Sequence, residues 1–298
     1  MKNLRAHIFL LLVNLIYGAN YTIAKVVMTG GYIKPFGFIL IRVSCAMVLF
    51  FTVHRIFIKE KIDKADIPRL ILCGIFGVAL NQLMFFKGLS YTYPINAALM
   101  MITTPILVMI IAAISLKEPI TKNKWLGAIL GAVGCAIVIT YGKKVSFGGE
   151  TVLGDFLVLI NATSYGIYLV LVKPLMKKYN PITVITYVFI FGFFPVLIFG
   201  YQEFSEIQWD TFTDQVWMAL AYVVIFTTFF AYLLNILALK DVSPTVVGGY
   251  IYLQPVISGV IAILAGVDSI NQWKIIGGLI IFLGVYLVTR QKPLPQKS

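Results

Sequence analysis

Arg42 is a charged residue deep inside an apolar run that covers residues 35–57, and a charge at that place indicates a functional role. It is seven residues into the run, roughly 10 Å along a helix. A cation within a membrane span is costly, so it is a functional candidate by default. Two explanations remain open. Arg42 binds a substrate carboxylate or joins a gating ion pair, or it extends to the interface and caps carbonyls of a neighbouring helix.

Asparagine, glutamine and tyrosine residues recur at helical spacing inside several other runs. A spacing of three, four or seven residues places such a set on one face of a helix. A single membrane Asn or Gln more often bonds a neighbouring helix, but the whole set favours a cavity for a small polar solute. We predict that this substrate-binding cavity is lined by Asn14, Tyr17, Arg42, Asn81, Gln82, Asn161, Tyr165, Tyr168, Tyr232, Asn235, Tyr250 and Gln254.

Carboxylates are absent from the middle of every apolar run, and Asn14 stands in the first run where a glutamate could serve. Proton-coupled export of lipophilic cations needs such a carboxylate. The sequence therefore favours uniport or facilitated efflux. It contains no P-loop, which argues against direct use of ATP.

Enzymatic chemistry has little support in the sequence. No cluster of His with Asp, and no pair of carboxylates, lies within the runs, so we predict no catalytic residue. Cys45, Cys73 and Cys135 lie in apolar runs without a CxxC motif or a nearby His. We expect them to be free thiols, and we expect no metal and no cofactor.

Ten apolar runs must position these residues. Of the 298 residues, 60% are hydrophobic and 12% charged, whereas soluble domains have about 45–50% apolar residues. About 20 apolar residues can cross a bilayer as a helix. The runs cover roughly 6–28, 35–57, 68–90, 94–116, 123–141, 153–175, 182–202, 215–239, 244–266 and 272–290. We predict an all-α membrane protein with ten transmembrane helices, the first too long for a cleaved signal peptide.

The basic residues indicate the orientation of these helices. Seventeen of the 24 Lys and Arg residues lie in segments on the side of the N-terminus, and six lie on the other side. Basic residues gather on the cytoplasmic side, so we expect both termini there. The net charge of +12 is then a topology signal, and we expect no nucleic-acid partner.

The two halves of the chain repeat one plan. At an offset of 150 residues, Pro94 pairs with Pro244, Pro105 with Pro255 and Glu118 with Asp268; Gly127 pairs with Gly277 and Gly134 with Gly284. Matches of this kind at one offset indicate an internal duplication. We predict one five-helix repeat over 1–146 and another over 149–298.

An odd number of helices per half inverts the second repeat relative to the first. Inverted repeats build alternating access in many transporters, with the substrate at the repeat interface. Pro105 and Pro255 lie at equivalent places in mid-span, and each removes a backbone hydrogen bond. We predict that they are gating hinges, although a static kink is the alternative. Gly127 and Gly131 form a GxxxG motif, which we interpret as packing within the molecule.

Several short motifs occur in an order that resembles a known family. They are ALNQLMFFKGLSYTYPINAAL (79–99), Pro105 followed by LKEPIT (116–121), WLGAILGAVG (125–134), GDFLVLINATSYGIY (154–168) and Pro255. The resemblance is to the ten-helix, EamA-type branch of the drug/metabolite transporter superfamily, over nearly the whole chain. It implies an inner-membrane exporter or facilitator of amino acids or other small metabolites. It also implies a central cavity that excludes the fifth and tenth helices. Asp268 departs from the glutamate usual in relatives.

Other functions remain as alternatives. A nucleotide-sugar, organophosphate or drug exchanger would show several basic residues facing the cavity, and only Arg42 lies deep in a span. A non-transporting membrane scaffold would not need duplicated, kinked and polar-striped helices. We expect a small-molecule substrate and the lipid bilayer as partners, and a monomer or weak homodimer.

The basic bias predicts the topology. A reporter fused after Ser298 should be cytoplasmic, and one inserted within 203–213 should be external, because the second segment is acidic and lies an odd number of spans away. Paired phosphatase and fluorescent-protein fusions measure this. Both sites on the same side would contradict the inverted arrangement.

Overall fold

A computed structural model of the chain describes residues 2–29, 31–141, 149–266 and 269–290. The first half contains α1 (Lys2–Thr29), α2 (Pro35–Val53), η1 (His54–Ile58), η2 (Lys64–Asp66), α3 (Ile67–Gly74), η3 (Ile75–Ala79), α4 (Leu80–Leu89), α5 (Pro94–Met101), α6 (Thr104–Leu116) and α7 (Lys122–Thr140). The second contains η4 (Gly149–Thr151), α8 (Val152–Val172), α9 (Leu175–Lys178), α10 (Pro181–Ser205), η5 (Trp209–Thr211), α11 (Asp214–Tyr222), η6 (Val223–Phe230), α12 (Ala231–Asp241), α13 (Pro244–Tyr250), α14 (Leu253–Leu264) and α15 (Gln272–Thr289).

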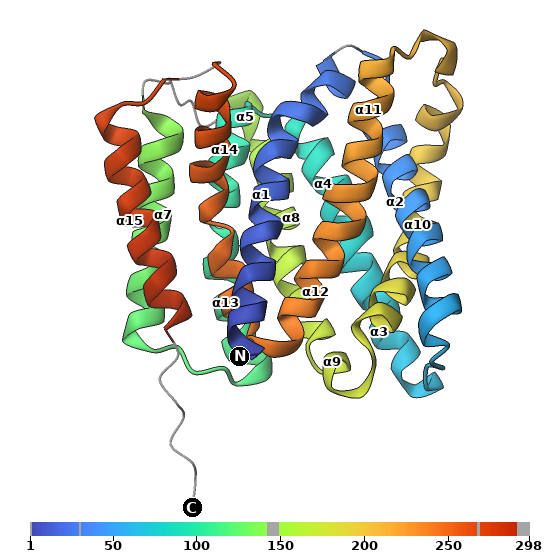
Figure 1. Ribbon diagram of the computed structural model, residues 1–298, viewed down its shortest axis with the longest axis horizontal. Coiled ribbons are helices and arrows are strands. Elements are labelled where there is room, and N and C mark those ends of the chain that lie inside the picture. Colours follow the sequence, from blue (N-terminus) through green and yellow to red (C-terminus); the bar gives the residue numbers. More distant parts are fainter. Residues whose placement is uncertain (1, 30, 142–148, 267–268, 291–298) are drawn as a thin grey trace, which may run out of the picture.

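These elements form ten spans, which confirms the predicted fold class. In the described part of the chain, nine helical stretches are long and apolar enough to cross a membrane, and a shorter apolar stretch, Leu4–Asn20, lies within α1. The chain is therefore a multi-pass membrane protein. Because each half has five spans, α1 and α8 cross in opposite directions (Figure 1). α1 begins and α15 ends on the same side of the bundle.

Prolines and capping side chains set where the spans begin. In each half the second and fourth spans start with a proline in the first turn: Pro35 and Pro94, then Pro181 and Pro244. Proline is favoured there because its fixed φ suits a helix and the first N–H groups have no helical partner. Side chains of Thr121, Asn180, Thr213, Ser243 and Asn271 accept hydrogen bonds from the next turn. Such caps satisfy donors that lipid cannot.

Four spans are irregular at equivalent places in the two halves. The fourth span breaks at residues 102–103 between α5 and α6, and the ninth at 251–252 between α13 and α14. Pro105 and Pro255 lie within the first turn after each break. The third and eighth spans contain the π-helical segments η3 and η6. π-Helical turns often occur at functional sites because they redirect side chains.

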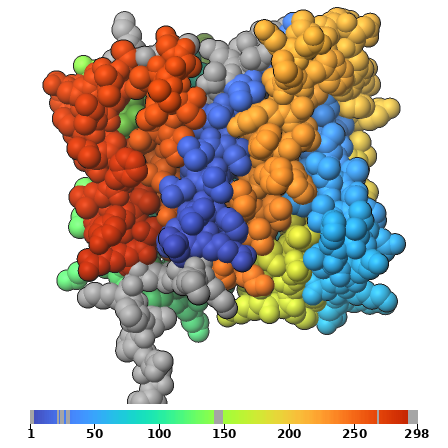
Figure 2. Space-filling view, in the orientation of Figure 1, coloured from blue at the N-terminus to red at the C-terminus, as the bar shows by residue number. Residues whose placement is uncertain are grey.

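The spans pack as a bundle with two paired edges. α7 and α15 form one edge, and α2 and α10 form the other (Figure 1). α1 lies between α12 and α14, and Figure 2 shows it filling the face between those segments. α4 packs against α8 and α1 packs against α12, so helices from both halves meet in the middle of the bundle.

Glycines hold α7 and α15 together at backbone contact. A Cβ added to Gly284 would lie 2.6 Å from the backbone N of Gly131 and 2.7 Å from the carbonyl O of Gly127. A Cβ on Gly134 would lie 2.7 Å from the carbonyl O of Gly277. Small residues allow such close approach in membranes, where dispersion contacts replace the hydrophobic effect. The GxxxG motif thus packs within the molecule, as its sequence indicated.

Gly284→Ala should separate these two helices, because its methyl group would meet backbone atoms that cannot move aside. Overpacking of this kind costs about 1–3 kcal/mol, so we expect a melting temperature roughly 2–5 °C lower. A fluorescence-detected thermal scan in detergent measures it. The matched control is Gly259→Ala in α14, whose added methyl has no atom within 4 Å. Equal stability of the two variants would contradict the contact.

Candidate functional site: a polar cavity between the two halves

A cavity of about 240 Å³ lies at the centre of the bundle, where the two halves meet. Its walls come from α1, α2, α4, α5 and α6 of the first half and from α8, η6, α12, α13 and α14 of the second. None of the described lining residues lies on α7 or α15. The lining residues are Leu10, Val13, Asn14, Tyr17, Asn20, Arg42, Asn81, Gln82, Phe85, Phe86, Met101, Thr104, Asn161, Tyr165, Tyr168, Leu169, Thr227, Tyr232, Asn235, Ile236, Leu239, Val247, Ile251 and Gln254.

Eleven of the twelve residues predicted for the cavity line it, and Tyr250 does not. The Tyr250 hydroxyl is 2.8 Å from Nδ1 of His7, a contact that joins α13 to α1. The prediction placed Tyr250 and Gln254 on one face of a continuous helix. The break at 251–252 ends that helix and changes their relative direction. That the other eleven bind substrate stays a prediction.

Arg42 is buried, with 8% of its surface exposed. Its Nε donates a hydrogen bond of 3.0 Å to Oγ1 of Thr228, and its guanidinium lies 5.5 Å from the centre of the Phe38 ring. No ion pair to Arg42 occurs among the described residues. The side chain therefore points into the bundle and not to the interface, and Thr228 is a neutral hydrogen-bond partner of its guanidinium.

The π-helical segment η6 positions the partner of Arg42. The Thr228 hydroxyl donates to the carbonyl O of Val223, five residues earlier, at 2.9 Å. This bond fixes the hydroxyl so that its oxygen can accept from Arg42 Nε. One hydroxyl thus joins the second span of the first half to the eighth span of the chain.

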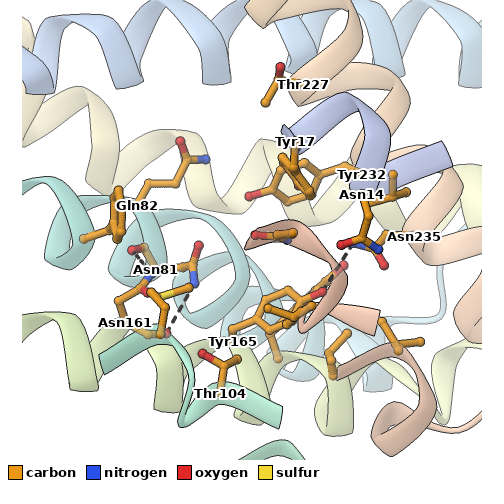
Figure 3. A pocket seen from close by; sticks show the side chains of 18 of the residues that line it. Asn14, Tyr17, Asn81, Gln82, Thr104, Asn161, Tyr165, Thr227, Tyr232 and Asn235 are labelled. Carbon is orange, nitrogen blue, oxygen red and sulfur yellow. Dashed lines mark hydrogen bonds between the residues drawn. The ribbon is translucent and has the colours of Figure 1, made fainter. Parts of the chain in front are cut away.

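The cavity asparagines share one arrangement (Figure 3). Nδ2 of Asn14 donates to the carbonyl O of Leu10 at 2.6 Å, and Nδ2 of Asn235 donates to the Tyr165 hydroxyl at 3.3 Å. Asn81 and Asn161 donate to each other's carbonyl O at 3.3 and 2.6 Å, which joins α4 to α8. Asn81, Asn161 and Asn235 thus bond a neighbouring helix, as the helix-bonding alternative predicted, whereas Asn14 bonds a carbonyl of its own helix.

The amide oxygens of this set are different. Oδ1 of Asn14, Asn161 and Asn235 is buried without a hydrogen-bond partner in the described part of the chain. Thr104 Oγ1 is in the same condition. A buried acceptor without a partner costs free energy. That cost is removed when a ligand or water donates a hydrogen bond to the acceptor. The cavity wall therefore offers three amide oxygens as acceptors, together with the Thr104 hydroxyl and the Gln82 amide, whose Nε2 and Oε1 both lack a partner among the described residues.

Sequence reasoning missed Asn20, Thr104 and Thr227. Asn20 lies three residues after Tyr17, and its Oδ1 accepts from Thr227 Oγ1 at 3.1 Å. Thr104 directly precedes Pro105 at the break, which was a usable signal. The side chain of Tyr21, which shares the spacing of Asn14 and Tyr17, lies outside the described residues.

Charged groups link helices at both ends of the bundle. Glu118 Oε1 accepts from Lys124 Nζ at 2.8 Å and from Ser243 Oγ at 2.7 Å, which connects the fourth span to the start of the ninth. Its repeat partner, Asp268, lies outside the described residues. At the other end Lys34 Nζ lies 2.6 Å from Glu206, and this hydrogen bond raises the pKa of Lys34. Lys34 and Glu206 are both exposed, so their ion pair adds little stability.

The fold and cavity define a ten-helix membrane protein with a polar cavity between its two halves. The EamA-like transporter family model matches residues 4–140 and 152–290. The chain belongs to the EamA-like transporter family, within the drug/metabolite transporter superfamily.

Individual relatives agree with this assignment. The chain is 28% identical over 292 residues to the uncharacterized transporter YyaM of Bacillus subtilis (strain 168), covering 96% of this chain and 93% of that protein. It is 22% identical over 232 residues to the "Probable terminal-alkyne amino-acid exporter" of Streptantibioticus cattleyicolor, covering 76% and 74%. A crystal structure with 16% identity superimposes with a TM-score of 0.78 and covers 95% of this chain and 96% of its own, which supports the fold.

Proposed function

We propose that this transporter carries small polar solutes that bear a carboxylate, amino acids among them, out of the cell across the inner membrane. The single observation that carries the proposal is the buried guanidinium of Arg42, which faces a cavity and has no acidic partner among the described residues. Two parallel hydrogen bonds from a guanidinium suit a carboxylate. Arg42 would then be the anchor that holds the substrate.

The position of the cavity supports transport by alternating access. Both halves contribute lining residues, so a movement of one half against the other changes access to the site. Transporters of inverted repeats bind substrate at such an interface, near unwound helix segments. The breaks at 102–103 and 251–252 both adjoin lining residues, since Met101 and Thr104 flank the first and Ile251 lies in the second. We infer that these breaks act as hinges, with the termini on the cytoplasmic side.

The direction and the amino-acid class rest on similarity. One relative carries the name of an amino-acid exporter, and a cavity of amides and tyrosines suits a polar solute that must leave as readily as it enters. An organophosphate or nucleotide-sugar exchanger is less well supported, because Arg42 is the one Lys or Arg among the described lining residues. Phosphate groups call for several such donors.

Arg42→Lys should weaken binding of carboxylates about tenfold, because an ammonium keeps the charge but loses the two parallel hydrogen bonds. Arg42→Ala should abolish binding and leave assembled protein in the membrane. Ligand-dependent thermal shifts and flux in proteoliposomes, over a panel of amino acids and simple carboxylates, measure both. The control is Arg69→Lys at an exposed arginine away from the cavity. Full transport by Arg42→Lys would remove the anchor.

Pro105→Ala and Pro255→Ala should slow turnover several-fold and leave expression and thermal stability near those of the wild type. Each substitution gives the chain a backbone N–H that can bridge the break and stiffen the hinge. Initial rates of counterflow in proteoliposomes measure this. Pro195→Ala, inside α10 and away from the cavity, should transport at the normal rate. If all three variants match the wild type, the two breaks serve packing only.

A further inference from the structure

Asn14 and Asn235 form a pair of acceptors at one end of the cavity. Figure 3 shows both side chains at the same end, with Tyr17 and Tyr232 between them and the amides of Asn81 and Gln82. Asn14 is 2% exposed, and its nitrogen is already bonded to the backbone of α1. The nitrogen of Asn235 is bonded to Tyr165. Each nitrogen already bonds protein, whereas each Oδ1 is buried without a partner in the described part of the chain, so the pair can offer two carbonyl oxygens to whatever fills the cavity.

Arg42 lies at the other end of the cavity from the Asn14–Asn235 pair. Residue spacing on two helices gives the distance between Arg42 and this pair. Its Nε bonds Thr228, which precedes Asn235 by seven residues on the η6–α12 helix, or about 10 Å at the helical rise. On α1, Asn20 bonds the neighbouring Thr227 and follows Asn14 by six residues, or about 9 Å. Because α1 packs against α12, the two spacings are independent estimates of the same distance along the cavity.

Opposite chemistry at the two levels selects a ligand with separated poles. The guanidinium donates hydrogen bonds, and the Asn14–Asn235 pair accepts them. An ammonium has three donors and no acceptor, so it satisfies both amide oxygens at once. The Tyr17 and Tyr232 rings line the cavity near this pair, and aromatic faces attract cations. In a compact α-amino acid the ammonium and carboxylate share one carbon, so it cannot reach both levels.

We propose that the preferred ligand is an ω-amino carboxylate, with its carboxylate on Arg42 and its ammonium on Asn14 and Asn235. This inference rests on the proposed function, since it takes Arg42 as the carboxylate anchor. It adds the second recognition point and the distance between the two. A chain of several methylenes joins the poles and passes between the tyrosine rings.

Binding constants for four probes test the spacing. Titration calorimetry of the protein in lipid nanodiscs would compare glycine, γ-aminobutyrate, ε-aminocaproate and caproate. From glycine to ε-aminocaproate, the distance between the ammonium and the carboxylate increases. Caproate has the carboxylate but no ammonium. We expect affinity to rise along the amino series, with ε-aminocaproate binding at least tenfold more tightly than glycine and than caproate.

Variants of Asn235 assign the ammonium site. Asn235→Leu should remove the preference, so that the Kd ratio between caproate and ε-aminocaproate falls to near one. Asn235→Asp has the same shape and places a carboxylate at the site, so it should bind ε-aminocaproate several-fold more tightly than the wild type. This result tests the site even if Asn235→Leu folds poorly. Ser164→Ala is the control, because it is a buried substitution on α8 that removes a hydrogen bond to the carbonyl O of Phe76 without changing a lining residue.

The outcomes separate this inference from the proposed function. Equal binding of glycine and ε-aminocaproate would overturn the two-pole ligand and leave the carboxylate anchor intact. Equal binding of ε-aminocaproate and caproate would show that water satisfies the amide oxygens, with the same consequence. Failure of every probe to bind would overturn the anchor itself.

Discussion

One costly group, the guanidinium of Arg42, sits among helices that cross a bilayer, and the neighbouring structure accommodates it. An ionised group buried without compensation is strongly destabilising. The described residues supply one threonine hydroxyl and one aromatic ring. The remaining donors face a cavity rich in amides and tyrosines. The Arg42 cation is tolerated at this depth because the cavity is polar. An anion that enters the cavity stabilises it most.

The backbone around Arg42 is irregular for a related reason. Irregular segments at membrane depth occur only where the freed groups meet protein or line a cavity. η3 and η6 and the breaks in the fourth and ninth spans all adjoin the cavity walls. The π-helical segment η6 also holds Thr228, so the irregular backbone positions the partner of the cation. Arg42 and Thr228 lie on the second and eighth spans and the breaks lie on the fourth and ninth, and all four spans meet at the cavity.

Much of this arrangement could be predicted from the sequence, because hydrophobicity, proline and repeat spacing are strong local signals. The span boundaries, the equivalence of Pro105 and Pro255 and the depth of Arg42 followed from them. The breaks also explain the failure at Tyr250, since helical spacing holds only within a continuous helix. The π-helical segments have no comparable signal. Nor does the direction of each amide, because it depends on carbonyls such as that of Leu10 and on Tyr165, which only the packed structure brings close.

The most direct test of the account is a structure of the protein in nanodiscs with a carboxylate that it binds. The account predicts that the carboxylate oxygens lie within hydrogen-bond distance of the terminal nitrogens of Arg42, inside the cavity between the halves. A carboxylate bound elsewhere, with Arg42 still bonded only to Thr228, would contradict it.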